Sequence, residues 1–160
     1  MLQILLENNG KSSLADTAHQ ALKDGFEWLI LPPDTTDDDI DTVAGICREA
    51  GVILTIEDNI EACRKHGLHG VFLRLGANPP AVRRELGAEA IIGAEIASAA
   101  TATELAKADI DYFAMPPAAS HVVGEIRSAG IQTPIVAIGT TAAELQPLLA
   151  AGFSGIMING

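Results

Sequence analysis

The feature that most constrains this chain is a repeated unit, in which a helical stretch ends in glycine and a short apolar run follows. Gly51 precedes the apolar run 52–56, and Gly130 precedes the run 134–138. A glycine after the last helical turn lets the backbone adopt a left-handed conformation and ends the helix. Apolar runs without alternation are typical of strands that are covered on both faces, as in a parallel sheet. The repeat therefore predicts βαβ units.

The unit recurs often enough to close a barrel. We expect strands at residues 2–6, 28–31, 52–56, 71–73, 91–94, 112–115, 134–138 and 155–158. We expect helices at residues 14–23, 37–50, 60–66, 80–86, 102–108, 120–129 and 142–151. Right-handed crossovers would then give one minimal (βα)8 TIM-type barrel domain over residues 1–160, with its final helix missing. Because such barrels usually have about 200 residues or more, a barrel with an open seam and an open sheet of fewer strands remain alternatives.

Composition limits the core and the compartment. Hydrophobic residues make up 48% of the chain and aromatic residues only 4%, which predicts a core of Ala, Ile, Leu and Val. Cys47 and Cys63 fall in predicted helices without metal-ligand spacing, as expected of buried thiols in a reducing compartment. No apolar run approaches the roughly 18 residues of a membrane span, and the first residues do not have the pattern of a signal peptide. We therefore expect a cytoplasmic protein.

Charge limits the partners. The formal net charge is −11 and the sequence pI is near 4.6. Nucleic acids and anionic membranes need a basic surface, so neither is an expected partner. A small phosphorylated ligand remains possible if backbone N–H groups or a bridging metal hold it.

The stretch from Ile53 to Leu73 carries a family resemblance. An apolar strand ends in Glu57-Asp58-Asn59, a short helix follows, and residues 67–73 read Gly-Leu-His-Gly-Val-Phe-Leu. The thiamine phosphate synthase and thiazole tautomerase family has similar motifs at this spacing. Further matches follow in the same order at residues 91–93, 111–112, 136–139 and 151–156. The resemblance covers about residues 51–160.

The resemblance implies a site at the carboxyl ends of the strands, where family members join a pyrimidine diphosphate to a thiazole phosphate with Mg²⁺, or tautomerise the thiazole. By this resemblance Asp58 matches the family's Mg²⁺-binding Asp. Other groups of the family site have no counterpart in this chain. The family's Gln-x-Arg-x-Lys motif is replaced by Leu-Pro-Pro-Asp at residues 31–34, and residues 74–78 contain no second metal-binding Asp. The family also has a Lys-containing loop, which residues 116–119 replace. The family's phosphate-binding Ser is Glu95, and the tautomerase His is Ala97. We therefore expect no useful synthase activity.

Without the family, the strand ends still present a group of polar residues. Glu95 and either Glu57 or Asp58 are expected to converge, and they would then need a divalent cation, Arg74 or a shared proton. A carboxylate pair of this kind can serve as an acid or base. The candidate catalytic residues are Asp58, Glu95 and Glu57; the candidate ligand-binding residues are Arg74, Gly139, Thr140, Asn159 and Glu7; the candidate metal ligand is Asp58, for Mg²⁺.

Simpler roles compete with these. Asp58 lies just before a predicted helix and could be its N-cap, and the other acids could simply be solvated. Gly139 and Thr140 could bind a phosphate at a helix N-terminus, or the threonines could be plain caps.

Three functions follow as expectations. The first is a divergent synthase-like protein that binds a small phosphorylated or heterocyclic ligand. The second is a metal-assisted lyase or isomerase that uses Glu57, Asp58 and Glu95, and the third is a non-catalytic binding or assembly subunit. A homodimer is also expected, because the seam between the first and last strands has no helix to cover its apolar residues. Candidates for that face are Ile4, Leu6, Ile156 and Ile158.

Overall fold

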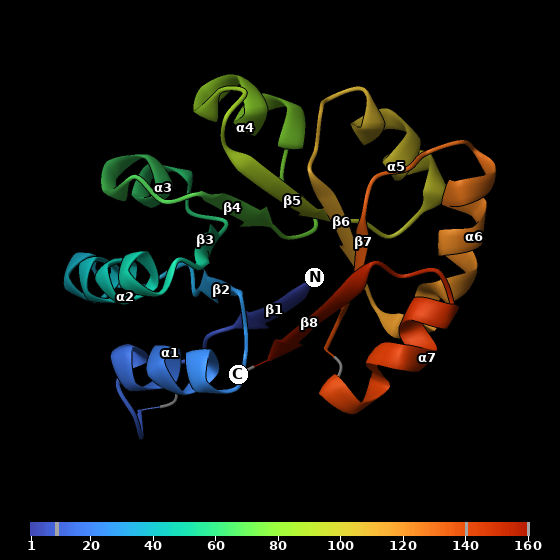
Figure 1. Cartoon of the computed structure of the whole chain (residues 1–160). Helices are drawn as coiled ribbons and strands as arrows, with labels where there is room; N and C mark the ends of the chain where they lie inside the picture. Colours follow the sequence, from blue (N-terminus) through green and yellow to red (C-terminus); the bar gives the residue numbers. More distant parts are fainter. Residues whose placement is uncertain (9, 140, 160) are drawn as a thin grey trace.

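The computed structural model describes residues 1–8, 10–139 and 141–159, and its centre is a closed barrel of parallel strands. The strands are β1 (Leu2–Leu5), β2 (Trp28–Leu31), β3 (Ile53–Glu57), β4 (Gly70–Leu73), β5 (Ile91–Glu95), β6 (Tyr112–Met115), β7 (Ile135–Ile138) and β8 (Gly155–Asn159). They follow one another around the barrel in chain order, as Figure 1 shows. The predicted barrel of eight strands is confirmed.

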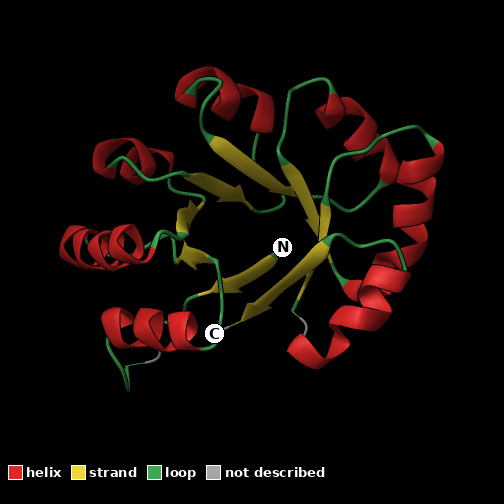
Figure 2. Ribbon diagram, viewed as in Figure 1, coloured by secondary structure: helices red, strands yellow, loops and turns green. Residues whose placement is uncertain are grey.

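Helices form the outer layer of the molecule (Figure 2). They are α1 (Leu14–Lys23), α2 (Asp37–Ala50), α3 (Ile60–His66), α4 (Pro79–Leu86), α5 (Ala99–Ala106), α6 (Ser120–Ser128) and α7 (Leu145–Ala150), with 3₁₀ turns η1 (Pro117–Ala119) and η2 (Ala142–Glu144). The helix predicted at 142–151 is thus divided. Pro147 has no amide N–H for a continuous helix that starts at Ala142, so α-helical bonding begins only at Leu145.

The barrel closes between its first and last strands. β1 and β8 pair in parallel, from Leu2 opposite Ile156 to Leu5 opposite Asn159. The open-seam and open-sheet alternatives are therefore wrong. No helix follows β8 within the residues that the structure describes.

The apolar seam expected to drive dimerisation is covered within one chain. Ile4, Leu6 and Ile156 are 8%, 3% and 0% exposed and belong to the same apolar layer as Leu14 of α1 and Leu148 of α7. Helices beside the seam thus cover most of it without a helix after β8. The homodimer stays a prediction, but it loses the physical reason that the sequence suggested.

Two apolar clusters follow from the alternation of side chains along each strand. Residues that point outward pack under the helices, and residues that point inward fill the barrel. The interior holds three of the few aromatic residues, with the Tyr112 ring 5.3 Å from Trp28 and 6.2 Å from Phe72. A Cβ at Gly93 would overlap the Tyr112 ring, so glycine makes room for it. The expectation of a purely aliphatic core is wrong for the barrel interior.

Two further expectations from the sequence concern the burial of the cysteines and the absence of membrane spans. Cys47 and Cys63 are buried free thiols, and burial raises the pKa of each to about 11. Neither is therefore an activated nucleophile. None of the helices in the described parts of the chain has the length and apolar character needed to cross a membrane.

A histidine joins α2 to α3. The His66 side chain is 6% exposed, and its two ring nitrogens lie 2.8 Å from carboxylate oxygens of Asp37 and Asp41. Both oxygens are acceptors, so both ring nitrogens must donate, which requires the imidazolium form. Hydrogen bonds to Asp37 and then Asp41 accordingly raise the pKa of His66 above 6.5.

This contact predicts a pH-dependent stability. Because the folded-state pKa of His66 is raised, its stabilising contribution is fully present below about pH 6.5 and is lost as the pH rises through that raised pKa. We expect wild type to unfold at a higher urea concentration than H66Q at pH 6, with a smaller difference at pH 9. The matched control is H121Q, because His121 is an exposed residue of α6. If the unfolding midpoints of wild type and H66Q differed equally at both pH values, the assignment of a stabilising imidazolium at His66 would be contradicted.

Candidate functional site

The candidate site lies at the carboxyl ends of three neighbouring strands. Glu57 and Glu95 are the last residues of β3 and β5, and Arg74 directly follows β4 between them. Thr55 and Gly93 precede the two glutamates by two positions and share their inward-facing side of the strand. Strand pairing therefore brings one cation and two acids to the mouth of the barrel.

Arg74 binds both glutamates. Its Nε donates to Glu95 Oε1 at 3.0 Å, and its Nη1 lies 3.4 Å from Glu57 Oε1. The same Glu95 oxygen accepts the backbone N–H of Leu75 at 3.1 Å. The guanidinium also lies over the Phe72 ring, 5.5 Å from its centroid. The predicted convergence of Glu57 and Glu95 is confirmed, and of the three expected means of neutralising them the structure contains Arg74.

The Asp58 side chain binds the backbone at the end of β4 and does not cap α3. Its Oδ1 accepts the backbone N–H of Arg74 at 2.9 Å, and its own φ is +53°, in the left-handed region. The N-cap of α3 is Asn59, whose side chain accepts the N–H of Ala62 at 3.0 Å. The capping interpretation of Asp58 is therefore wrong, because the backbone reversal at Asp58 turns its carboxylate towards the end of β4.

Burial changes the acidity of one glutamate. The Glu57 side chain is 20% exposed, and burial raises the pKa of its carboxyl above the usual 4.5. The negative charges of Asp58 and Glu95 raise the pKa further, whereas the positive charge of Arg74 lowers it. The burial of Glu57 and its negative neighbours thus favour the protonated form of its carboxyl, against the effect of Arg74.

Two hollows border Arg74. The first, of about 410 Å³, is lined by Leu5, Leu6, Glu7, Asn8, Pro32, Asp34, Glu57, Arg74 and Asn159. The second hollow, of about 510 Å³, lies over the loops after β4 and β5 and the starts of α4 and α5. Its lining includes Glu95, Asn78, Thr101 and Leu75, and Leu75 is 60% exposed. Sequence reasoning identified Arg74 and Glu95 at this second hollow but missed its uncharged lining residues, since such loop residues carry no pattern.

The predicted ligand-binding residues divide into two groups. Glu7 and Asn159 line the first hollow beside Arg74. Gly139 has a φ of +74°, and its N–H already donates to Met157 O at 3.0 Å, so this group is not available to a phosphate. Thr140 lies outside the described residues. Thr141 donates its hydroxyl to Glu144 at 3.3 Å.

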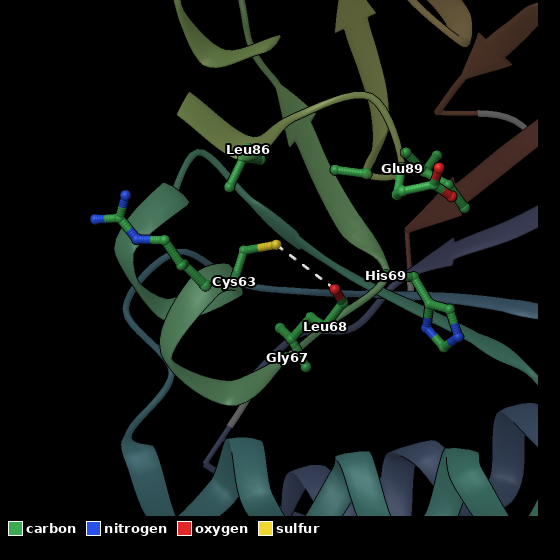
Figure 3. A pocket seen from close by; sticks show the side chains of 9 residues that line it. Cys63, Gly67, Leu68, His69, Leu86 and Glu89 are labelled. Carbon is green, nitrogen blue, oxygen red and sulfur yellow. Dashed lines mark hydrogen bonds between the residues drawn. The ribbon is translucent and has the colours of Figure 1, made fainter. Parts of the chain in front are cut away.

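A third hollow, of about 400 Å³, opens at the opposite end of the barrel (Figure 3). Here the Cys63 thiol points to the carbonyl of Leu68 at 3.8 Å, and His69 lies on the far side of the hollow. His69 Nδ1 accepts the N–H of Leu54 at 3.1 Å, so it joins two strands. In barrels of this type the amino ends of the strands serve stability, whereas the carboxyl ends carry the chemistry.

The predicted Mg²⁺ site does not fit the donors at the mouth. Mg²⁺ takes near-octahedral oxygen ligands, usually with one or two carboxylates. Here Asp58 accepts a backbone N–H, and the Arg74 guanidinium holds Glu57 and Glu95. Across residues 1–8, 10–139 and 141–159, no group of three or more His, Cys, Asp or Glu side chains has the arrangement of a metal site.

Comparison with known proteins gives one consistent match. The sequence profile of the thiamine monophosphate synthase family matches residues 3–159. A thiamine-phosphate synthase of Phocaeicola vulgatus is 30% identical, over 99% of this chain and 88% of the relative. One of Bacteroides fragilis is 26% identical, over 99% of this chain and 90% of the relative. The alignment with the first relative spans 183 positions, more than the 160 residues of this chain, so the relative has residues where this chain has none.

The solved structures agree on the fold. A thiamine phosphate pyrophosphorylase from Pyrococcus furiosus superimposes with a TM-score of 0.84 and 20% identity, over 99% of this chain and 84% of that one. Together with the profile match over nearly the whole length, this similarity confirms the resemblance seen in the sequence. The chain belongs to the thiamine monophosphate synthase family.

Proposed function

We propose that this chain is a ligand-binding member of its family that does not make thiamine phosphate at a useful rate. One observation carries the proposal: Arg74, the one cation among the described residues that line the first hollow, is already paired with two carboxylates. A departing diphosphate needs preorganised positive charge to stabilise it. An arginine neutralised by Glu57 and Glu95 supplies little of that charge.

The loop after β2 supports the same conclusion. The resemblance places an Arg and a Lys of the family here, but in this chain the loop contributes Pro32 and Asp34 to the first hollow. Glu7 adds another acid to the lining. Like charges in a partly enclosed site disfavour a ligand with several negative charges. The ligand class we propose is therefore a small heterocycle that is neutral or carries at most one phosphate.

The test is an assay of thiamine phosphate formation with both family substrates and Mg²⁺. The Phocaeicola vulgatus relative, measured in the same assay, is the positive control. We expect a rate at least roughly 10²-fold lower than that of the relative, since removing a single preorganised donor typically costs about 10²–10³ in rate. Comparable turnover by the two proteins would refute the proposal.

Ligand binding is tested separately by thermal unfolding with neutral and monophosphorylated pyrimidines and thiazoles. A ligand at 100 times its dissociation constant adds about 2.7 kcal/mol to the free energy of unfolding, which is readily measured. We expect stabilisation by at least one compound of this class and none by the pyrimidine diphosphate. A protein stabilised only by the diphosphate would contradict the proposed ligand class.

Glu57 favours one second candidate, an acid–base isomerase or lyase that acts on the same ligand class. A half-buried carboxyl with a raised pKa that lines a hollow is a suitable group to exchange a proton with a ligand. Arg74 and Glu95 would orient that carboxyl. Loss of turnover in E57Q, with ligand stabilisation retained, would separate this activity from binding alone.

A further inference from the structure

All three acids predicted for a metal at the barrel mouth are engaged by a single residue. Arg74 binds Glu95 and Glu57 through its guanidinium, and its backbone N–H donates to Asp58 at 2.9 Å. The Arg74 side chain thus holds one oxygen of each glutamate, and its backbone holds one oxygen of Asp58, in the place where a divalent ion would gather these carboxylates.

The partial burial of these groups favours a resident cation. The side chains of Glu57 and Glu95 are only 20% and 13% exposed, against 36% for Arg74. Two carboxylates removed from water at short range are unfavourable unless a positive charge lies between them. The Phe72 ring beneath the guanidinium, 5.5 Å away, favours its position further.

We propose that Arg74 is the permanent cation of this site and stands in for a resident divalent metal, so that the mouth binds its ligand without one. The proposal rests on the proposed function only in placing a ligand at the mouth. Arg74 borders both hollows, so in either of them its guanidinium occupies the place among the carboxylates that a metal ion would take.

One consequence can be measured without any ligand. Replacing Arg74 with glutamine leaves Glu57 and Glu95 without a counter-ion while their strands hold them at the same mouth. Carboxylates bind Ca²⁺-like hard cations through oxygens at about 2.3–2.6 Å, and glutamate side chains can adjust to such a distance. Removal of the guanidinium should therefore create affinity for a divalent ion.

The experiment titrates the full chain with Mn²⁺ and follows free Mn²⁺ by electron paramagnetic resonance. The variants are wild type, R74Q, and R74Q combined with E57Q and E95Q. R64Q is the matched control, because Arg64 is an exposed arginine paired with Glu85 at 3.3 Å and its loss changes the net charge equally. We expect R74Q to bind one Mn²⁺ at least tenfold more tightly than wild type or R64Q, and the triple variant to lose that gain.

Circular dichroism checks that each variant is folded, and a second measurement uses wild type alone. In NMR spectra of wild type, low concentrations of Mn²⁺ should show no preference for the barrel mouth. The signals of exposed surface acids such as Asp16 should broaden at least as much as those of Glu57, Asp58 and Glu95. Broadening centred on the mouth of wild type would overturn the proposal. A folded R74Q that binds Mn²⁺ no better than R64Q would overturn it as well. Synthase turnover by wild type would instead contradict the proposed function and leave these metal results unchanged.

Discussion

Replacing Gly70 with alanine is expected to destabilise the barrel more than any other change considered for this chain. Gly70 begins β4, and a Cβ at this position would clash with backbone atoms of Ile91 in the neighbouring strand. Backbone atoms of a paired strand cannot move aside as a flexible side chain can. We expect the free energy of unfolding to fall by more than about 4 kcal/mol. Since total stabilities are about 5–15 kcal/mol, this change would remove a large share of the stability of the protein.

Urea unfolding followed by circular dichroism measures this effect. Gly124→Ala is the matched control, because Gly124 lies inside α6 and a Cβ there meets no atom within 4 Å. Alanine is favoured over glycine inside a helix by roughly 0.5–1 kcal/mol, so this variant should be slightly more stable than wild type. Equal unfolding curves for the two variants would show that the strands do not approach as closely as described.

Loss of Arg83 is the second large effect. This residue of α4 is 13% exposed, and it donates to the carbonyl oxygens of Ala90 at 2.7 Å and Asp109 at 2.6 Å. It also forms an ion pair of 2.8 Å with Asp111, whose Oδ2 accepts the N–H of Ile92 at 2.7 Å. One side chain thus ties α4 to the segments that enter β5 and β6. Arg83→Ala would leave these carbonyls without their donor and Asp111 without its ion pair, which we expect to cost about 1–3 kcal/mol.

The neighbouring arginine provides the control for this prediction. Arg84 is exposed on the same helix, so Arg84→Ala changes the charge equally and should alter the free energy of unfolding by no more than about 0.5 kcal/mol. Both variants are compared with wild type by urea unfolding at one pH and salt concentration. If Arg83→Ala and Arg84→Ala unfold at the same urea concentration, the contacts of Arg83 are not the support that we infer.

Much of the scaffold could be predicted because its signals are local. Apolar runs that follow a glycine placed the strands, and the hydroxyl residues Thr36 and Ser98, each just before a helix, cap α2 and α5. The same regularity located the acids: Glu57 and Glu95 each lie two residues after an inward-facing position, so both had to face the mouth once the strands paired in order. Membership of the family was also visible in the motifs of residues 51–160.

Only the tertiary structure decided how these parts meet. Closure of the barrel depends on β1 and β8, which lie at opposite ends of the sequence, so local patterns could not decide between the predicted barrel and its open alternatives. The partner of both glutamates is Arg74, because strand order places that residue between them. Asp58 binds the backbone of Arg74 and leaves the cap of α3 to Asn59. In each case the deciding contact joins residues far apart in the chain or depends on one backbone angle. Sequence periodicity cannot predict such a contact, because it reports only which side of an element each residue occupies.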